Sequence, residues 1–70
     1  MDMKKVNGGK LRAIGHDAGT RVLRVELDDG KVVEYAAVTA ETFRRLASSS
    51  SMWSFFRDNI EDEYTAKRLK

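Results

Sequence analysis

Residues 20–38 constrain the fold more than any other stretch, because apolar and polar residues alternate on both sides of an Asp-Asp-Gly sequence. Alternation with a period of two is typical of a half-buried β-strand, and Asp-Gly between two such runs is a strong hairpin signal. We therefore predict antiparallel strands at residues 20–27 and 31–37, joined by a tight turn at residues 28–30.

The length of this turn decides the register of the two strands. A two-residue loop would place Val25 beside Glu34, which mixes apolar and charged side chains on one face. A three-residue loop, with Gly30 in the left-handed conformation, gathers apolar side chains on one face and opposite charges on the other, so we favour it. Its cross-strand pairs are Leu27–Lys31, Val25–Val33, Leu23–Tyr35 and Arg24–Glu34.

The rest of the chain indicates one more strand and two helices. Thr39 is a good helix N-cap, a run of four serines would end the helix that follows it, and the last of these serines can cap a second helix. The residues before the hairpin alternate more weakly, as expected for a first strand. The predicted elements are a strand at 11–16 and helices at 40–47 and 52–60.

Together these elements predict a small α+β domain, in which a three-stranded antiparallel meander packs against two short C-terminal helices. We expect a single domain over residues 1–70, because no linker or internal repeat is visible. Residues 1–9 are polar and contain two glycines, so we expect them to be loosely ordered.

Composition excludes several kinds of site. The chain has no cysteine and one histidine, which excludes disulfides, thiolate metal sites and histidine-rich metal sites. No apolar run approaches the roughly 18 residues of a membrane span, so we expect a cytosolic protein, and we expect no cofactor and no metal. The formal net charge of +2 is too small by itself to indicate a nucleic-acid partner.

No group of residues makes a catalytic constellation. His16 precedes Asp17, but adjacent residues on a strand point to opposite faces, so His16 is interpreted as a solvated residue beside a turn. The sequence Gly8-Gly9-Lys10 lacks the spacing of a phosphate-binding loop. We therefore do not expect an enzyme.

Two surfaces are candidates for binding. The first combines basic residues with nearby aromatic residues, as in many single-stranded nucleic-acid sites. Its candidate residues are Arg44, Arg45, Arg57, Lys67, Arg68 and Lys70. The second is the start of the second helix, where Met52 and Trp53 are expected to be partly exposed and suited to a protein partner. Free amides there, beside Ser50 and Ser51, are a weaker candidate for a phosphate site.

Short pieces along nearly the whole chain resemble the KTSC domain. They are Ala13-Ile14-Gly15-His16-Asp17, Thr20-Arg21-Val22-Leu23, Asp29-Gly30-Lys31-Val32-Val33-Glu34-Tyr35, Val38, Ser51 with Phe55-Phe56, and Asn59-Ile60. This short domain occurs alone in bacterial and phage proteins and at the C-terminus of some lysyl-tRNA synthetases. Its function is not established, and its association with the synthetase implies RNA binding.

The chain departs from the family pattern at positions that bear on binding. Where the family tends to have Lys and Gly at the start of the second helix, this chain has Met52 and Trp53. Arg57 stands where the family has Asn, and His16 where it tends to have Tyr. The loss of Lys and Gly weakens the phosphate-site hypothesis, and the gain of Met and Trp favours an apolar contact.

Two hypotheses follow for the function. The first, which the resemblance favours, is an accessory module of the KTSC type that binds nucleic acid, in the first place RNA. The second is a small protein-interaction module, or a modulator of the kind phages and mobile elements encode, that docks through Met52 and Trp53.

Overall fold

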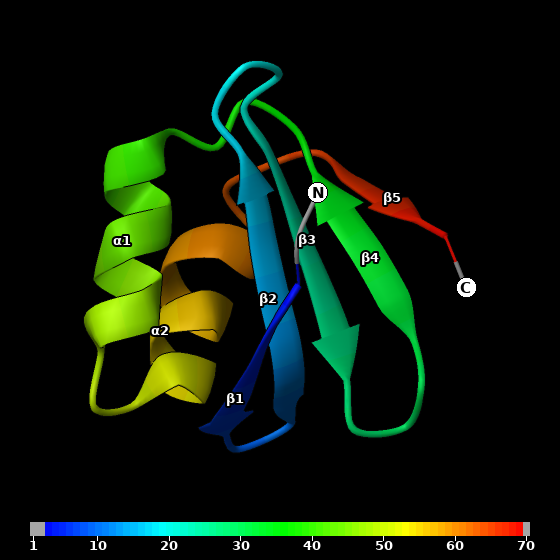
Figure 1. Cartoon of the computed structure of the whole chain (residues 1–70), viewed down its shortest axis with the longest axis vertical. Coiled ribbons are helices and arrows are strands. Elements are labelled where there is room, and N and C mark those ends of the chain that lie inside the picture. Colours follow the sequence, from blue (N-terminus) through cyan, green and yellow to red (C-terminus); the bar gives the residue numbers. More distant parts are fainter. Residues whose placement is uncertain (1–2, 70) are drawn as a thin grey trace.

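The computed structural model describes residues 3–69, which form an antiparallel β-sheet flanked by helices (Figure 1). In chain order the elements are β1 (Lys4–Gly8), β2 (Leu11–Asp17), β3 (Val22–Leu27), β4 (Val32–Tyr35), α1 (Ala40–Ser48), α2 (Met52–Phe56), the π-helical turn η1 (Arg57–Glu61) and β5 (Ala66–Arg68). The five strands lie in the sheet in chain order. In Figure 1 the helices lie on the β2 side of the molecule and β5 on the opposite side. The α+β class agrees with the sequence prediction, whereas the number of strands does not.

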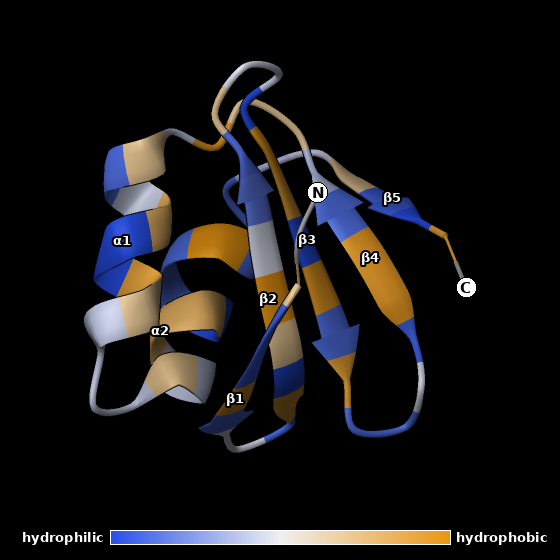
Figure 2. Cartoon of the chain, viewed as in Figure 1, coloured by the Kyte–Doolittle hydropathy of each residue, from blue (hydrophilic) through white to orange (hydrophobic). Residues whose placement is uncertain are grey.

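The register of the central hairpin is the three-residue-loop register favoured from the sequence. Leu23 pairs with Tyr35, Arg24 with Glu34 and Val25 with Val33. Gly30 has a φ of 91°, and the amide of Leu27 donates to the Lys31 carbonyl over 2.8 Å. Figure 2 shows the resulting alternation of hydrophobic and hydrophilic residues along β3. The hairpin therefore presents one apolar face to the core.

The prediction of a loosely ordered segment at residues 1–9 is wrong for Lys4–Gly8, and its first two residues lie outside the described residues. Lys4–Gly8 forms β1, which pairs with β2 through Lys5 and Ala13 among others. The only bulky apolar residue in β1 is Val6, so its sequence carries no alternation for a strand prediction to use. The strand forms because β2 is buried and its free backbone edge requires hydrogen-bond partners.

The second missed strand is β5, at the other edge of the sheet. Its three residues are all exposed and pair with β4. The amide of Leu69 donates to the Val32 carbonyl over 2.8 Å, and the amide of Ala36 donates to the Thr65 carbonyl over 3.1 Å. Backbone pairing alone makes this strand, so no hydrophobic pattern indicated it.

The second helix also differs from the prediction of a regular helix at 52–60. The α-helical part ends at Phe56, and the chain continues as the π-helical turn η1. The side-chain amide of Asn59 donates to the carbonyl of Phe55, which is the acceptor that the backbone amide of Asn59 would use in an α-helix. Phe56 and Ile60 remain buried on either side of this change.

The core lies between the apolar face of the sheet and the two helices. Tyr35 is 4% exposed and meets the ring of Phe56 edge-on at 5.4 Å, as the hairpin register requires. The buried apolar residues are Leu11, Ala13, Ile14, Leu23, Val25, Tyr35, Val38, Leu46, Phe56 and Ile60.

His16 is not the solvated residue that its sequence context indicated. Its Nε2 lies 2.6 Å from the carbonyl oxygen of Val38, which can only accept, so Nε2 carries the proton. Its ring stacks on Phe43, with 5.2 Å between the ring centroids. His16 therefore connects β2 to the first turn of α1.

The turn between β1 and β2 packs directly on the start of α2. A Cβ atom added at Gly8 would lie 2.8 Å from the Cβ of Met52, and one added at Gly9 would lie 2.9 Å from the Cβ of Trp53. Gly9 also has a φ of 64°, in the left-handed region. Both glycines are therefore needed for the close approach of β1 to the helix.

We predict that Gly9→Ala destabilises the protein by about 2–5 kcal/mol, because a clash with Trp53 adds to the cost of a left-handed alanine. In a Trp53→Gly background the clash is absent, and the same change should cost only about 1–2 kcal/mol. Trp53→Ala is the matched control, because it retains the Cβ that makes the contact. Urea unfolding of the six proteins measures the coupling, and an equal cost of Gly9→Ala in all three backgrounds would contradict the contact.

We also predict a loss of stability at high pH that depends on Tyr35. Burial, and then the charges of Glu61 and Asp62, raise the pKa of Tyr35 above its ordinary value of 10.0. The unfolded chain therefore releases this proton first, so the stability contribution is complete below about pH 10 and declines above it. Tyr35→Phe should lessen the decline, and Tyr64→Phe serves as the control. Urea unfolding between about pH 9 and about pH 11 tests this, and an identical slope in Tyr35→Phe and wild type would refute it.

Candidate nucleic-acid interface

The basic residues predicted from the sequence do not form one surface. Arg44 and Arg45 are exposed on α1, and Arg57 begins η1. Lys67 and Arg68 lie on β5, at the edge of the sheet on the opposite side of the molecule from α1 (Figure 1). The predicted basic residues are therefore spread over separate elements. Lys70 lies outside the described residues.

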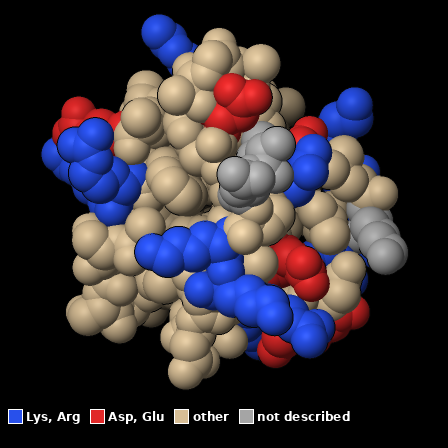
Figure 3. All heavy atoms as spheres, in the orientation of Figure 1, with Lys and Arg blue, Asp and Glu red and all other residues tan. Residues whose placement is uncertain are grey.

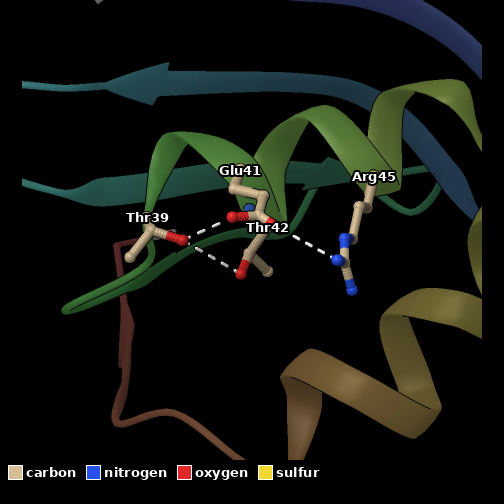
Figure 4. Close-up of polar contacts among 4 residues, drawn as sticks. All are labelled: Thr39, Glu41, Thr42 and Arg45. Atoms are coloured by element: carbon tan, nitrogen blue, oxygen red, sulfur yellow. Dashed lines mark hydrogen bonds and ion pairs between the residues drawn. The ribbon is translucent and has the colours of Figure 1, made fainter.

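Arg45 has a local partner on its own helix. Its Nη2 lies 2.8 Å from the Oε1 of Glu41, one turn earlier, and both side chains are exposed (Figure 4). At the start of the same helix, Thr39 accepts a hydrogen bond from the amide of Thr42. An exposed ion pair between residues four apart, such as Arg45 and Glu41, stabilises a helix by about 0.3–0.5 kcal/mol. Arg45 thus has a structural role that needs no ligand.

The serines before α2 lack the geometry of an anion site. Ser50 and Ser51 are exposed, and the Ser51 side chain makes no capping hydrogen bond. The Ser51 amide is occupied by the hydroxyl of Ser49 at 3.2 Å. With only five residues, α2 also contributes few aligned peptide dipoles. The phosphate-site hypothesis gains no support here.

Met52 and Trp53 are partly buried, as predicted, but the chain itself already covers part of both. The Trp53 ring stacks on Phe56 with 5.6 Å between centroids. The ammonium group of Lys10 lies 5.8 Å from the centre of the same ring, at a distance typical of a cation–π contact. The turn at Gly8 and Gly9 rests on both residues, so they first of all hold the β1–β2 turn in place.

The sequence prediction missed the basic surface of the β1–β2 hairpin. Lys4, Lys5, Lys10 and Arg12 are all exposed, and residues 3–16 contain no acidic side chain. Figure 3 shows a band of Lys and Arg side chains over β1 and β2. The available signal was the run of basic residues without an acidic one, in a segment that was expected to be loosely ordered.

The outer face of the sheet continues from this hairpin toward β5. Lys5 pairs with Ala13 at one edge, and at the other Arg24, Glu34 and Lys67 lie in one row across three strands. Because side chains alternate, this row lies on the face opposite Leu23 and Tyr35. The Nη2 of Arg24 lies 2.6 Å from the Oε2 of Glu34.

Aromatic rings do not line this outer face. Every aromatic residue among residues 3–69 belongs to the core cluster or packs against it: Tyr35, Phe43, Trp53, Phe55, Phe56 and Tyr64. A stacking platform of the kind found in many single-strand binding proteins is therefore absent from the outer face. Lys5 and Lys67 on this face offer a nucleic acid positive charge for its phosphate groups.

The described part of the chain shows neither of two other kinds of site. No helix within residues 3–69 is long and apolar enough to cross a membrane. In the same range, no three histidine or acidic side chains gather in a group that could hold a metal ion.

Comparison with known proteins identifies the family. The KTSC domain family matches residues 8–64, which is most of the chain. A crystal structure of a KTSC domain protein from Yersinia pestis superposes with a TM-score of 0.92 at 20% sequence identity, covering 99% of this chain and 97% of that one. At this identity the likeness shows a shared fold. No curated protein matches the chain. The protein therefore belongs to the KTSC domain family.

Proposed function

We propose that this protein binds RNA through the phosphate backbone, using the basic band on the β1–β2 hairpin. The observation that supports this most directly is the exposure of Lys4, Lys5, Lys10 and Arg12 on β1, β2 and the turn between them, with no acidic residue in residues 3–16. Lysine and arginine release condensed counterions when they neutralise phosphates, which favours binding at low salt. The association of related domains with a tRNA synthetase points to RNA as the nucleic acid.

A structural explanation for some of the same charges competes with this proposal. β1 is an edge strand, and lysines on edge strands prevent pairing with the edge of another sheet. If Lys4 and Lys5 serve only this purpose, their removal would cause self-association and would leave RNA affinity unchanged. The two explanations therefore predict different results for the same variant.

Docking of a protein at Met52 and Trp53 remains the second hypothesis. The β1–β2 turn already contacts both side chains, so the surface left for a partner is smaller than the sequence indicated. For this reason we do not place it first.

We predict that affinity for a single-stranded RNA falls with salt with a slope of about −3 in a plot of log K against log salt concentration, as for about four phosphate contacts. Lys5→Gln with Arg12→Gln should weaken binding and bring the slope to about −1.5, because each lost contact removes about 0.7. Fluorescence anisotropy with a labelled oligonucleotide measures both quantities.

Arg44→Gln with Arg45→Gln is the matched control, because it removes the same net charge from α1. This variant should retain nearly the wild-type slope. An equal effect of both double variants would show a response to net charge alone, and a larger effect of the α1 variant would place the site on the helix. Light scattering and RNA titration of a separate variant, Lys4→Gln with Lys5→Gln, test for the self-association that edge protection predicts.

A further inference from the structure

A half-open hollow of about 290 Å³ lies where β3, β4 and β5 meet. Its lining residues are Val22, Glu34, Tyr35, Ala36, Thr65 and Lys67, and most of the lining surface is apolar. Sites for drug-sized ligands usually measure about 300–1,000 Å³, so this hollow suits a single ring system. Glu34 and Lys67 also belong to the row of charged residues on the outer face of the sheet.

The backbone beside the hollow is strained. Arg21 has a φ of 57° and Ala37 a φ of 63°, and these are the only residues other than glycine with positive φ in the described chain. Arg21 immediately precedes the lining residue Val22, and Ala37 immediately follows the lining residue Ala36. A left-handed residue that is not glycine costs about 1–2 kcal/mol, and such strain is concentrated at functional sites.

One oxygen atom at the rim is available to a ligand. Arg24 directs both Nε, at 3.0 Å, and Nη2, at 2.6 Å, to the Oε2 of Glu34. Within residues 3–69 the other oxygen, Oε1, accepts no hydrogen bond. The arginine also holds the carboxylate in place, so Oε1 is an oriented acceptor beside an apolar floor.

We infer that the hollow holds one unpaired RNA base that carries an exocyclic amino group, such as cytosine. The aliphatic side chains of Val22 and Ala36 would contact the face of the base, and Oε1 of Glu34 would accept a hydrogen bond from the amino group, as acidic residues do from cytosine. Lys67 would contact the adjoining phosphate. This inference rests on the proposed RNA binding, because Lys5 of the basic hairpin lies on the same face of the sheet as Glu34 and Lys67.

The proposal requires that the bound RNA is single-stranded at this point. A base held in a duplex cannot enter the hollow, whereas an unpaired base can turn out of the strand, as in most sequence-specific recognition of RNA. Uracil has no exocyclic amino group and presents a carbonyl oxygen to the carboxylate instead. The site should therefore distinguish oligocytidine from oligouridine of the same length.

We expect wild-type protein to bind a cytidine decamer roughly fivefold more tightly than a uridine decamer, the effect of about one net hydrogen bond. Ala36→Leu fills the hollow, and should remove this preference while leaving the salt slope unchanged. Ala47→Leu on α1 is the matched control, because it is the same substitution at another exposed alanine and should retain the preference.

The results separate the two proposals. If wild-type protein binds neither decamer, RNA binding itself is overturned. If it binds both equally and Ala36→Leu changes nothing, the base site is overturned and backbone binding stands. Amide chemical shifts of wild-type protein during titration with the cytidine decamer give a second measurement that needs no variant. Changes at Val22, Ala36 and Thr65 would support the base site, whereas changes confined to the β1–β2 hairpin would exclude it.

Discussion

The register of the β3–β4 hairpin is the constraint on which the other elements depend. A slip of one residue between the two strands would put Tyr35 and Val33 on the face opposite Leu23 and Val25, because side chains alternate along a strand. Gly30 prevents this slip by taking a φ of 91° that permits the three-residue turn. With the register set, the apolar face meets Leu46, Phe56 and Ile60, and Arg24 and Glu34 pair on the other face. The turn therefore determines both which side chains enter the core and which lie on the outer face of the sheet.

The contact between the β1–β2 turn and α2 joins the edge of the sheet to the helices. The turn approaches Trp53 so closely that Gly9 has no room for a side chain. The tryptophan also stacks on Phe56 and lies below Lys10. A residue that looked like an exposed anchor in the sequence therefore supports the hairpin that carries the basic band.

In the two edge strands, the charged side chains do not determine the fold. The family match covers residues 8–64, whereas the structural likeness covers 99% of the chain and so includes both edges of the sheet. β1 and β5 are held by backbone hydrogen bonds, which almost any residue can make, and their side chains are mostly exposed. Basic residues can therefore gather on these strands without disturbing the core, and three of the proposed RNA contacts, Lys4, Lys5 and Lys67, lie on them.

Local chemistry determined what the sequence could predict by itself. The hairpin, its turn, the register and the capped start of α1 all follow from residues that are close in the chain, as does the expectation that Tyr35 lies in the core. Only the tertiary structure decided which distant residues meet. It packed Gly8 and Gly9 against α2 and hydrogen-bonded His16 to the Val38 carbonyl. It also added strands whose sequences show no alternation of apolar and polar residues. It also divided the predicted arginines between α1 and η1 and set Lys67 beside Glu34, because contacts between distant segments depend on how the sheet and helices pack.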